Sequence, residues 1–130
     1  MALPRFCGHL LPTRAPNWTL DGQALILNGN GALWRLDLLD GGEAIRVTEN
    51  DRSFHFLHGV SPDGQTLAYV GIEAGDFTQP GRLMTIPADG GAATAINVDG
   101  HCDGPEYSPD GELLYFNTEA FTDRPGHAQK

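Results

Sequence analysis

Two Ser-Pro-Asp-Gly segments place a hydroxyl and a carboxylate two residues apart, a pairing that could support nucleophilic chemistry. Ser61 and Asp63 form one pair, and Ser108 and Asp110 form the other. Neither pair has a histidine at a fixed offset, and the sequence has no Gly-x-Ser-x-Gly turn that would expose a nucleophilic serine. Hydroxyl and carboxylate groups at this spacing also cap the backbone of tight turns. We therefore interpret both pairs as turn-capping groups and predict no catalytic residue.

Two other patterns resemble known sites without matching them. Residues 28–32, NGNGA, lack the GxGxxG spacing of a phosphate-binding loop, and they precede an alternating strand pattern instead of a helix. Cys7 and Cys102 are too few for a disulfide framework, and neither lies in a cluster with zinc-ligand spacing. We expect a hairpin turn at the first and ordinary thiols at the second.

The phrase around the Ser-Asp pairs recurs along the chain. Residues 61–70 read SPDGQTLAYV, residues 108–117 read SPDGELLYFN, and residues 19–28 give a weaker copy, TLDGQALILN. The aspartate of each copy follows the previous one by 42 and then by 47 residues. Repeats of about 40–50 residues that contain several short strands are typical of propeller blades.

Each repeat carries signals for short antiparallel strands. In the first repeat, a strand at residues 24–28 leads into a glycine-rich hairpin at 29–31. Residues 32–38, ALWRLDL, then alternate between two faces, and a second turn precedes a fourth strand, EAIRVT. The second repeat follows the same plan with a long loop at 71–81, and the third stops at Lys130 before its third strand. We predict two complete blades and part of a third.

The bulk composition excludes several classes of partner. The 130 residues include 17 acidic and 8 basic side chains, which gives a formal charge of −9. This charge repels nucleic acid phosphates and anionic lipid surfaces. No stretch approaches the roughly 20 apolar residues of a membrane helix, and residues 1–16 lack the apolar core of a secretory signal. We expect a soluble, cytoplasmic protein without nucleic acid partners or membrane insertion.

The SPDGxxLxY phrase, followed by a strand such as LWRLDL and a Gly-Gly turn, resembles the WD-like repeats of TolB-like β-propellers. The resemblance covers residues 15–130, and HCDGPEYSPDGELLYFNTE is similar to a segment of bacterial six-bladed members. It implies an all-β fold of antiparallel four-stranded blades of the TolB-like six-bladed type in an incomplete ring. We expect an N-terminal segment at 1–14 and blades at approximately 15–56, 57–102 and 103–130, the last one truncated.

Two and a half blades cannot close a ring, because known propellers typically contain four to eight. The chain is therefore either a truncated product or a unit that assembles with another copy. Open blade faces carrying Trp18, Trp34, Tyr69 and Tyr107 would be adhesive if they stayed exposed. We expect a protein partner or self-association.

The same resemblance indicates where a ligand would bind, because the first strand of each blade lines the central channel in such propellers. His58, His101 and Asp103 would then lie near a common channel mouth, with Glu106 one step further along. Histidine and carboxylate groups that converge there could hold a divalent metal or a polar ligand; otherwise we expect no cofactor. The alternative is that these side chains bond turn backbone or face solvent. The loop at 71–81 is a second candidate surface.

The expected function is that of a non-enzymatic binding scaffold, as the TolB-like resemblance implies. A protein or a small polar ligand would bind at the channel mouth or on the loop face. The alternative is an enzymatic role, either as the gating propeller of a prolyl-oligopeptidase-type hydrolase or as a metal-dependent enzyme with its site at the channel mouth.

Overall fold

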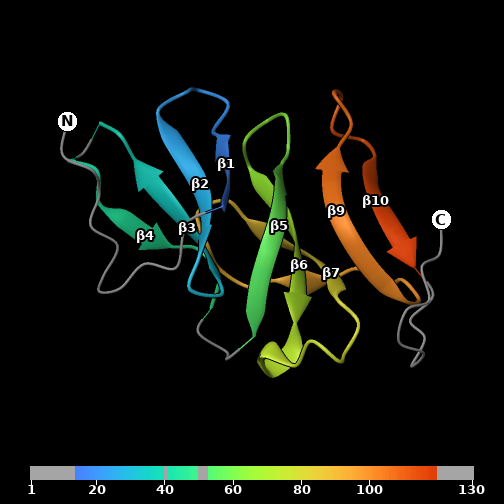
Figure 1. The fold of residues 1–130 in the computed structure, drawn as a ribbon. Helices are drawn as coiled ribbons and strands as arrows, with labels where there is room; N and C mark the ends of the chain where they lie inside the picture. Colours follow the sequence, from blue (N-terminus) through green and yellow to red (C-terminus); the bar gives the residue numbers. More distant parts are fainter. Residues whose placement is uncertain (1–13, 40, 50–52, 120–130) are drawn as a thin grey trace.

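The computed structural model describes residues 14–39, 41–49 and 53–119, which form three antiparallel sheets (Figure 1). In each sheet, neighbouring strands follow one another along the chain. The first sheet contains β1 (Arg14–Trp18), β2 (Ala24–Gly29), β3 (Ala32–Asp37) and β4 (Ala44–Arg46). The second contains β5 (Phe54–Val60), β6 (Thr66–Ile72), β7 (Arg82–Pro87) and β8 (Thr94–Ala95), with the short 3₁₀ helix η1 (Glu73–Gly75) after β6; the third contains β9 (His101–Tyr107) and β10 (Leu114–Glu119).

The sheets are arranged as successive blades around a common side. The first strands β1, β5 and β9 stand next to one another (Figure 1), whereas β4 and β8 are the last strands of their sheets. The predicted all-β class with four-stranded antiparallel blades is confirmed, and the sheets do not close into a ring. β5 and β9 begin at Phe54 and His101 and so cross the approximate blade boundaries expected at 56/57 and 102/103.

The repeated turns use their hydroxyl and carboxylate groups as predicted. The Ser61 hydroxyl donates a hydrogen bond of 2.6 Å to Asp63 Oδ1, which also accepts one of 2.9 Å from the Gln65 N–H. The Thr66 N–H donates to Ser61 Oγ at 3.0 Å, and Gly64 adopts a φ of +72° that favours glycine. The same bonds recur at the other two turns, around Thr19–Asp21 and Ser108–Asp110. The turn-capping interpretation is confirmed.

Acid should weaken these turns. The hydrogen bond from the Ser61 hydroxyl, together with that from the Gln65 N–H, holds the pKa of Asp63 below its ordinary value of 3.8, and similar bonds lower the pKa of Asp21 and Asp110. Because these folded-state values lie below the unfolded value, the carboxylates add stability above the unfolded pKa and lose it as the pH falls through the folded pKa. We expect the urea midpoint to stay level down to about pH 5 and to drop below about pH 4.

The variant with asparagine at all three turn aspartates provides the comparison for this pH series. It should be less stable than the wild type at pH 7, and its urea midpoint should fall less steeply in acid, because its turn side chains do not titrate. An acid decline of equal steepness in both proteins would show that other groups cause it.

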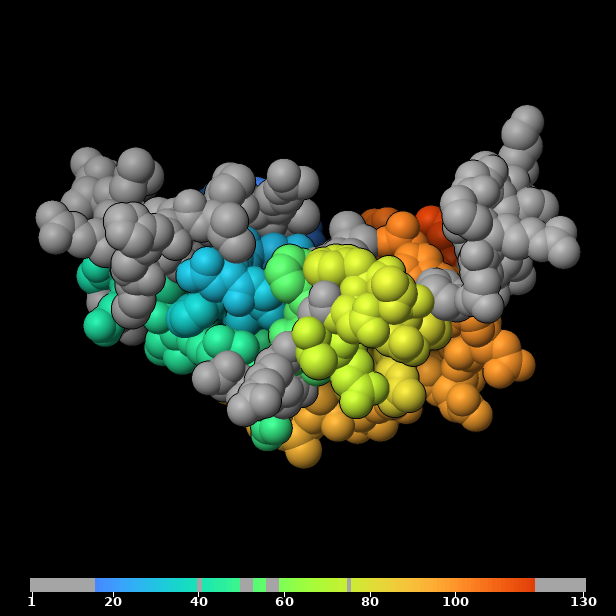
Figure 2. Space-filling view, turned by 60° about the horizontal axis from the view of Figure 1, so that its bottom comes forward, coloured from blue at the N-terminus to red at the C-terminus, as the bar shows by residue number. Residues whose placement is uncertain are grey.

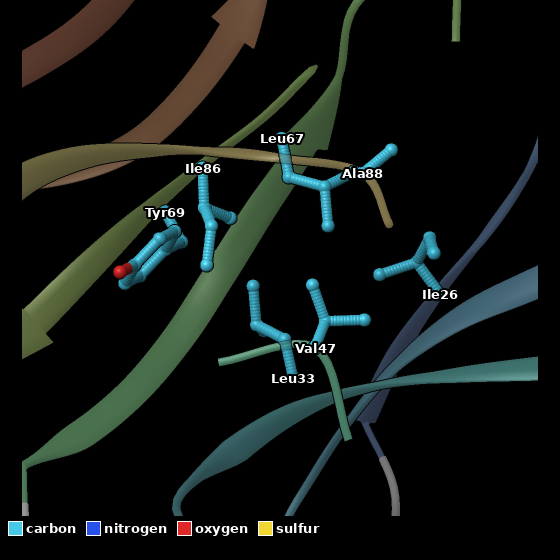
Figure 3. Packing of buried hydrophobic residues seen from close by; sticks show 7 residues of the cluster. All are labelled: Ile26, Leu33, Val47, Leu67, Tyr69, Ile86 and Ala88. Atoms are coloured by element: carbon cyan, nitrogen blue, oxygen red, sulfur yellow. The ribbon is translucent and has the colours of Figure 1, made fainter. Parts of the chain in front are cut away.

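The main hydrophobic core lies between the first two sheets (Figure 3). Leu67 and Tyr69, from the strand after the second Ser-Pro-Asp-Gly turn, are both buried within this cluster. Tyr69, at 2% exposure, is therefore not on an open blade face, whereas Trp18 is 60% exposed. The first sheet and the residue after it contribute Ile26, Leu33 and Val47, and the second sheet and the residue after β7 contribute Leu67, Tyr69, Ile86 and Ala88.

A bulge at the same place interrupts the first strand of every sheet. In β5, Phe56 pairs with Val70 and Gly59 pairs with Ala68, so a step of three residues faces a step of two. β1 and β9 show the same three-to-two register shift. Side-chain alternation is reset at such a bulge. The residues near the start of β5 and β9 therefore face the side opposite to that expected by counting back from the turn.

Candidate functional site

His101 forms a link between the second and third sheets. Its Nδ1 accepts a hydrogen bond of 2.8 Å from the Gly81 N–H, and the Cys102 N–H donates one of 3.0 Å to the Gly81 carbonyl oxygen. These two bonds join the start of β9 to the residue that precedes β7. One ring nitrogen of His101 therefore accepts a hydrogen bond from backbone, as in the alternative that these side chains bond backbone and not a ligand.

The predicted ligand residues lie on the first strands of two neighbouring sheets, His58 on β5 and the other three on β9, and their binding of a ligand stays a prediction. Glu106 is exposed and pairs with Tyr115 of β10. It lies five residues along β9 from His101, which corresponds to about 15 Å along a strand. Asp103 is half-buried between them. His58 lies in β5, but its side chain falls outside the described residues.

The strand register places the two predicted histidines at different positions. In the register of the sheets, His58 occupies the position of Pro105, and His101 occupies the position of Phe54. The two histidines stand at different distances from their turns, so they do not occupy equivalent places around the channel. Among the described side chains, no three His, Cys, Asp or Glu groups lie close enough together to hold a metal ion.

Of the two cysteines, the structure describes Cys102. Its side chain is buried, and burial raises the pKa of its thiol. A buried, protonated thiol is a poor nucleophile. Cys7 lies outside the described residues.

A pocket of about 350 Å³ lies between the first two sheets, at the end of the blade interface away from the Ser-Pro-Asp-Gly turn. We call it the interblade pocket. Figure 2 looks toward this end of the molecule, where the yellow-green loop containing η1 lies between the first sheet, in blue to teal, and the third sheet, in orange. The residues that line the interblade pocket are Glu49, Ser53, His55, Tyr69, Gly71, Glu73, Arg82, Met84, Ala93 and Ala95.

The floor of the interblade pocket is a buried pair of rings. His55 is 5% exposed and Tyr69 is 2% exposed, and their ring centroids are 5.2 Å apart at an interplanar angle of 81°. The His55 N–H donates a 2.9 Å hydrogen bond to the Gly31 carbonyl oxygen, which ties β5 to the first sheet. Gly71 pairs with His55 across the strands, and its missing side chain leaves the floor open.

The rim of the interblade pocket carries charge of both signs. Glu49, Glu73 and Arg82 are exposed there, while Met84 and Ala95 supply an apolar wall. Sequence reasoning missed this site because the bulge in β5 directs His55 toward the first sheet. The available signal was a histidine within the largely apolar strand FHFLHGV.

A second pocket of about 480 Å³ lies among the turns at the opposite end of the same interface. Asp21 and Asp63 line it, but their carboxylates already cap the turns. Arg35 and Asp89, also in its lining, lie 3.9 Å apart as an ion pair. Its polar groups are thus largely committed to the protein itself.

The long loop predicted as a binding surface is partly braced by the second sheet. Phe77 is 65% exposed, yet its ring meets that of Phe54 edge-on, with centroids 5.3 Å apart. Asp76 accepts a hydrogen bond of 3.0 Å from the Thr78 N–H, which fixes the turn beside Phe77. The loop therefore presents one exposed aromatic ring on an ordered base.

The comparisons with known proteins agree on the architecture. A structure assigned as TolB from Agrobacterium tumefaciens is 26% identical with a TM-score of 0.54, and it matches 82% of this chain and 54% of its own. TolB from Acinetobacter baumannii is 23% identical with a TM-score of 0.65, over 80% of this chain and 26% of its own. The fold is that of a TolB-type β-propeller with an open ring.

The remaining comparisons place limits on this likeness. The structure of an ancestral GH74 enzyme also matches this chain in fold, at a TM-score of 0.66 with 16% identity, over 86% of this chain and 16% of its own. An uncharacterized protein of Agrobacterium fabrum is 29% identical over 151 residues, covering 80% of this chain and 50% of that protein. The chain thus spans about half the length of these Agrobacterium relatives. No family model matches it.

No helix among the described residues is long and apolar enough to cross a membrane.

Proposed function

We propose that this chain is a non-enzymatic binding scaffold of the TolB-like propeller type, and that a protein partner covers the outer face of its third sheet. The carrying observation is the exposure of Tyr115, which is 60% accessible on β10. An aromatic ring of this size is costly to leave in water.

The repeat supports an inference about what covers this ring. Ile26, Ala68 and Tyr115 occupy the same register position in their sheets, because each pairs with the residue directly after the bulge of the first strand. Ile26 and Ala68 are fully buried. Ile26 packs into the core shared with the second sheet, and Gly59, the partner of Ala68, lies against Pro105 of the third sheet. Tyr115 is thus the exposed member of a set that is otherwise covered by the next blade.

The partner should therefore present a blade-like apolar strand face. A second copy of this chain has such faces, and we infer that it is the partner of the isolated chain. The half-length match to the Agrobacterium relatives supports this, because two copies would supply the length of one relative. Leu113, directly before β10, is also 56% exposed, so the surface contains an aliphatic side chain beside the ring of Tyr115.

Light scattering on the pure chain tests this proposal, because a second copy is then the only available cover. We expect a mass above the 14.0 kDa of one chain, rising with concentration. Tyr115→Lys should return the protein to a monomer, whereas Phe77→Lys, which alters an equally exposed ring on the loop of the second sheet, should not. A wild-type chain that stays monomeric at every concentration would contradict the proposal.

A further inference from the structure

We propose that the interblade pocket binds a small zwitterion of amino acid or dipeptide size. Its ammonium group would face Glu49 and Glu73, its carboxylate would face Arg82, and its apolar body would lie against Met84 and Ala95. This inference goes beyond the protein-binding surface proposed above, because it concerns the first two sheets and not the third.

The shape of the pocket sets the size of the ligand. Its volume of about 350 Å³ is at the lower end of the range for small-molecule sites, roughly 300–1,000 Å³. The floor made by His55 and Tyr69 is buried and the rim is exposed, so a ligand would enter with its apolar part first. A compound larger than a dipeptide would extend beyond the rim.

The rim charges set the chemistry. In the part of the chain that the structure describes, Arg82 forms no ion pair with Glu49 or Glu73, so all three charged groups can face a ligand. A guanidinium group matches the two oxygens of a carboxylate, and carboxylates match an ammonium group. A ligand with a negative charge alone would meet two like charges, and an amine alone would leave Arg82 without a counterpart.

The whole chain adds a long-range contribution. Its formal charge of −9 attracts cations and weakens the approach of anions. A zwitterion carries no net charge, so it avoids this repulsion while still placing its carboxylate at Arg82. The rim groups are exposed, and exposed ion pairs contribute little each, so we expect weak, selective binding.

Three matched compounds separate the contributions of the ligand's ammonium and carboxylate groups in an NMR titration of the full chain. L-Leucine is the zwitterion, isoamylamine is the same skeleton without the carboxylate, and 4-methylpentanoate is the skeleton without the amine. We expect L-leucine to shift the backbone amide signals of Gly71 and Met84. It should bind roughly two- to fivefold more tightly than isoamylamine or 4-methylpentanoate. Equal binding of the amine, or of the acid, would overturn the assignment of a zwitterion.

Variants of the chain locate the site. Arg82→Gln and Glu73→Gln should each weaken L-leucine binding by roughly two- to fivefold, while Glu112→Gln, an exposed carboxylate before β10, should leave it unchanged. Gly71→Ala adds one methyl group to the pocket floor at ordinary contact distances, with Met84 Cγ at 3.4 Å, so it should fold normally and reduce binding. Unchanged binding in Gly71→Ala and Arg82→Gln would overturn the site.

The two proposals fail separately. Absence of L-leucine binding overturns the zwitterion site and leaves the light-scattering result unaffected, because Tyr115 lies on the third sheet. Conversely, a monomeric chain that binds L-leucine overturns the proposed protein surface alone.

Discussion

The Gly59→Ala variant should unfold at a markedly lower urea concentration than the wild type. A Cβ atom at this position would stand 2.6 Å from the Pro105 carbonyl oxygen and 3.4 Å from Glu106 Cα. Both obstacles are backbone of the third sheet, which cannot rotate aside as a side chain could. Alanine gains about 0.5–1 kcal/mol over glycine in a strand, but overpacking costs about 1–3 kcal/mol or more. We expect a net loss in the free energy of unfolding.

Gly71→Ala is the matched control, because it makes the same substitution in the adjacent strand. Its Cβ would meet Met84, His55 and Tyr69 at 3.4, 3.6 and 3.9 Å, which are ordinary contact distances. The control should be as stable as the wild type or slightly more so. An equal loss in the two variants would show that the close approach to Pro105 does not decide the result.

The second large effect is expected from Leu67→Ala. Leu67 is 0% exposed and belongs to the core between the first and second sheets (Figure 3). Removing a buried leucine side chain loses its transfer free energy and leaves a cavity, which together cost about 2–5 kcal/mol. Urea unfolding followed by circular dichroism should show this loss.

Leu39→Ala provides the comparison for the core variant. Leu39 is 68% exposed after β3 in the first sheet, so its truncation should change the free energy of unfolding by no more than about 0.5 kcal/mol. If the two leucine variants lost stability equally, the buried interface would not be the main source of stability.

The blade scaffold could be predicted because its signals are local. Asp63 and Gly64 define a turn within four residues, and the recurrence of that turn locates each hairpin without knowledge of the rest of the chain. The alternation of residues 32–38 likewise marked a strand, which the structure has at Ala32–Asp37. Such features depend on neighbours in sequence, which a single sequence displays directly.

The candidate site could not be predicted in the same way, because it depends on register. The bulge adds one residue to each first strand, and this places His55 on the floor of the interblade pocket and separates His58 from the position of His101. The sequence signal beside the bulge in β5 is Gly59, directly after it, and a strand glycine is also found where another backbone approaches closely, as Pro105 does here. Tyr115 likewise stands out as a candidate contact only because the equivalent residue of the second sheet, Ala68, is buried.

Two glycines bring the second and third sheets of this protein close together. At one end of β9, Gly81 bonds to His101 and Cys102, and a Cβ there would stand 3.1 Å from the Cys102 carbonyl oxygen. Further along β9, Gly59 lies directly against Pro105. The two sheets are thus held at two separate points by approaches with little room for a side chain, so the angle between these neighbouring blades is constrained by backbone and not by adaptable side chains.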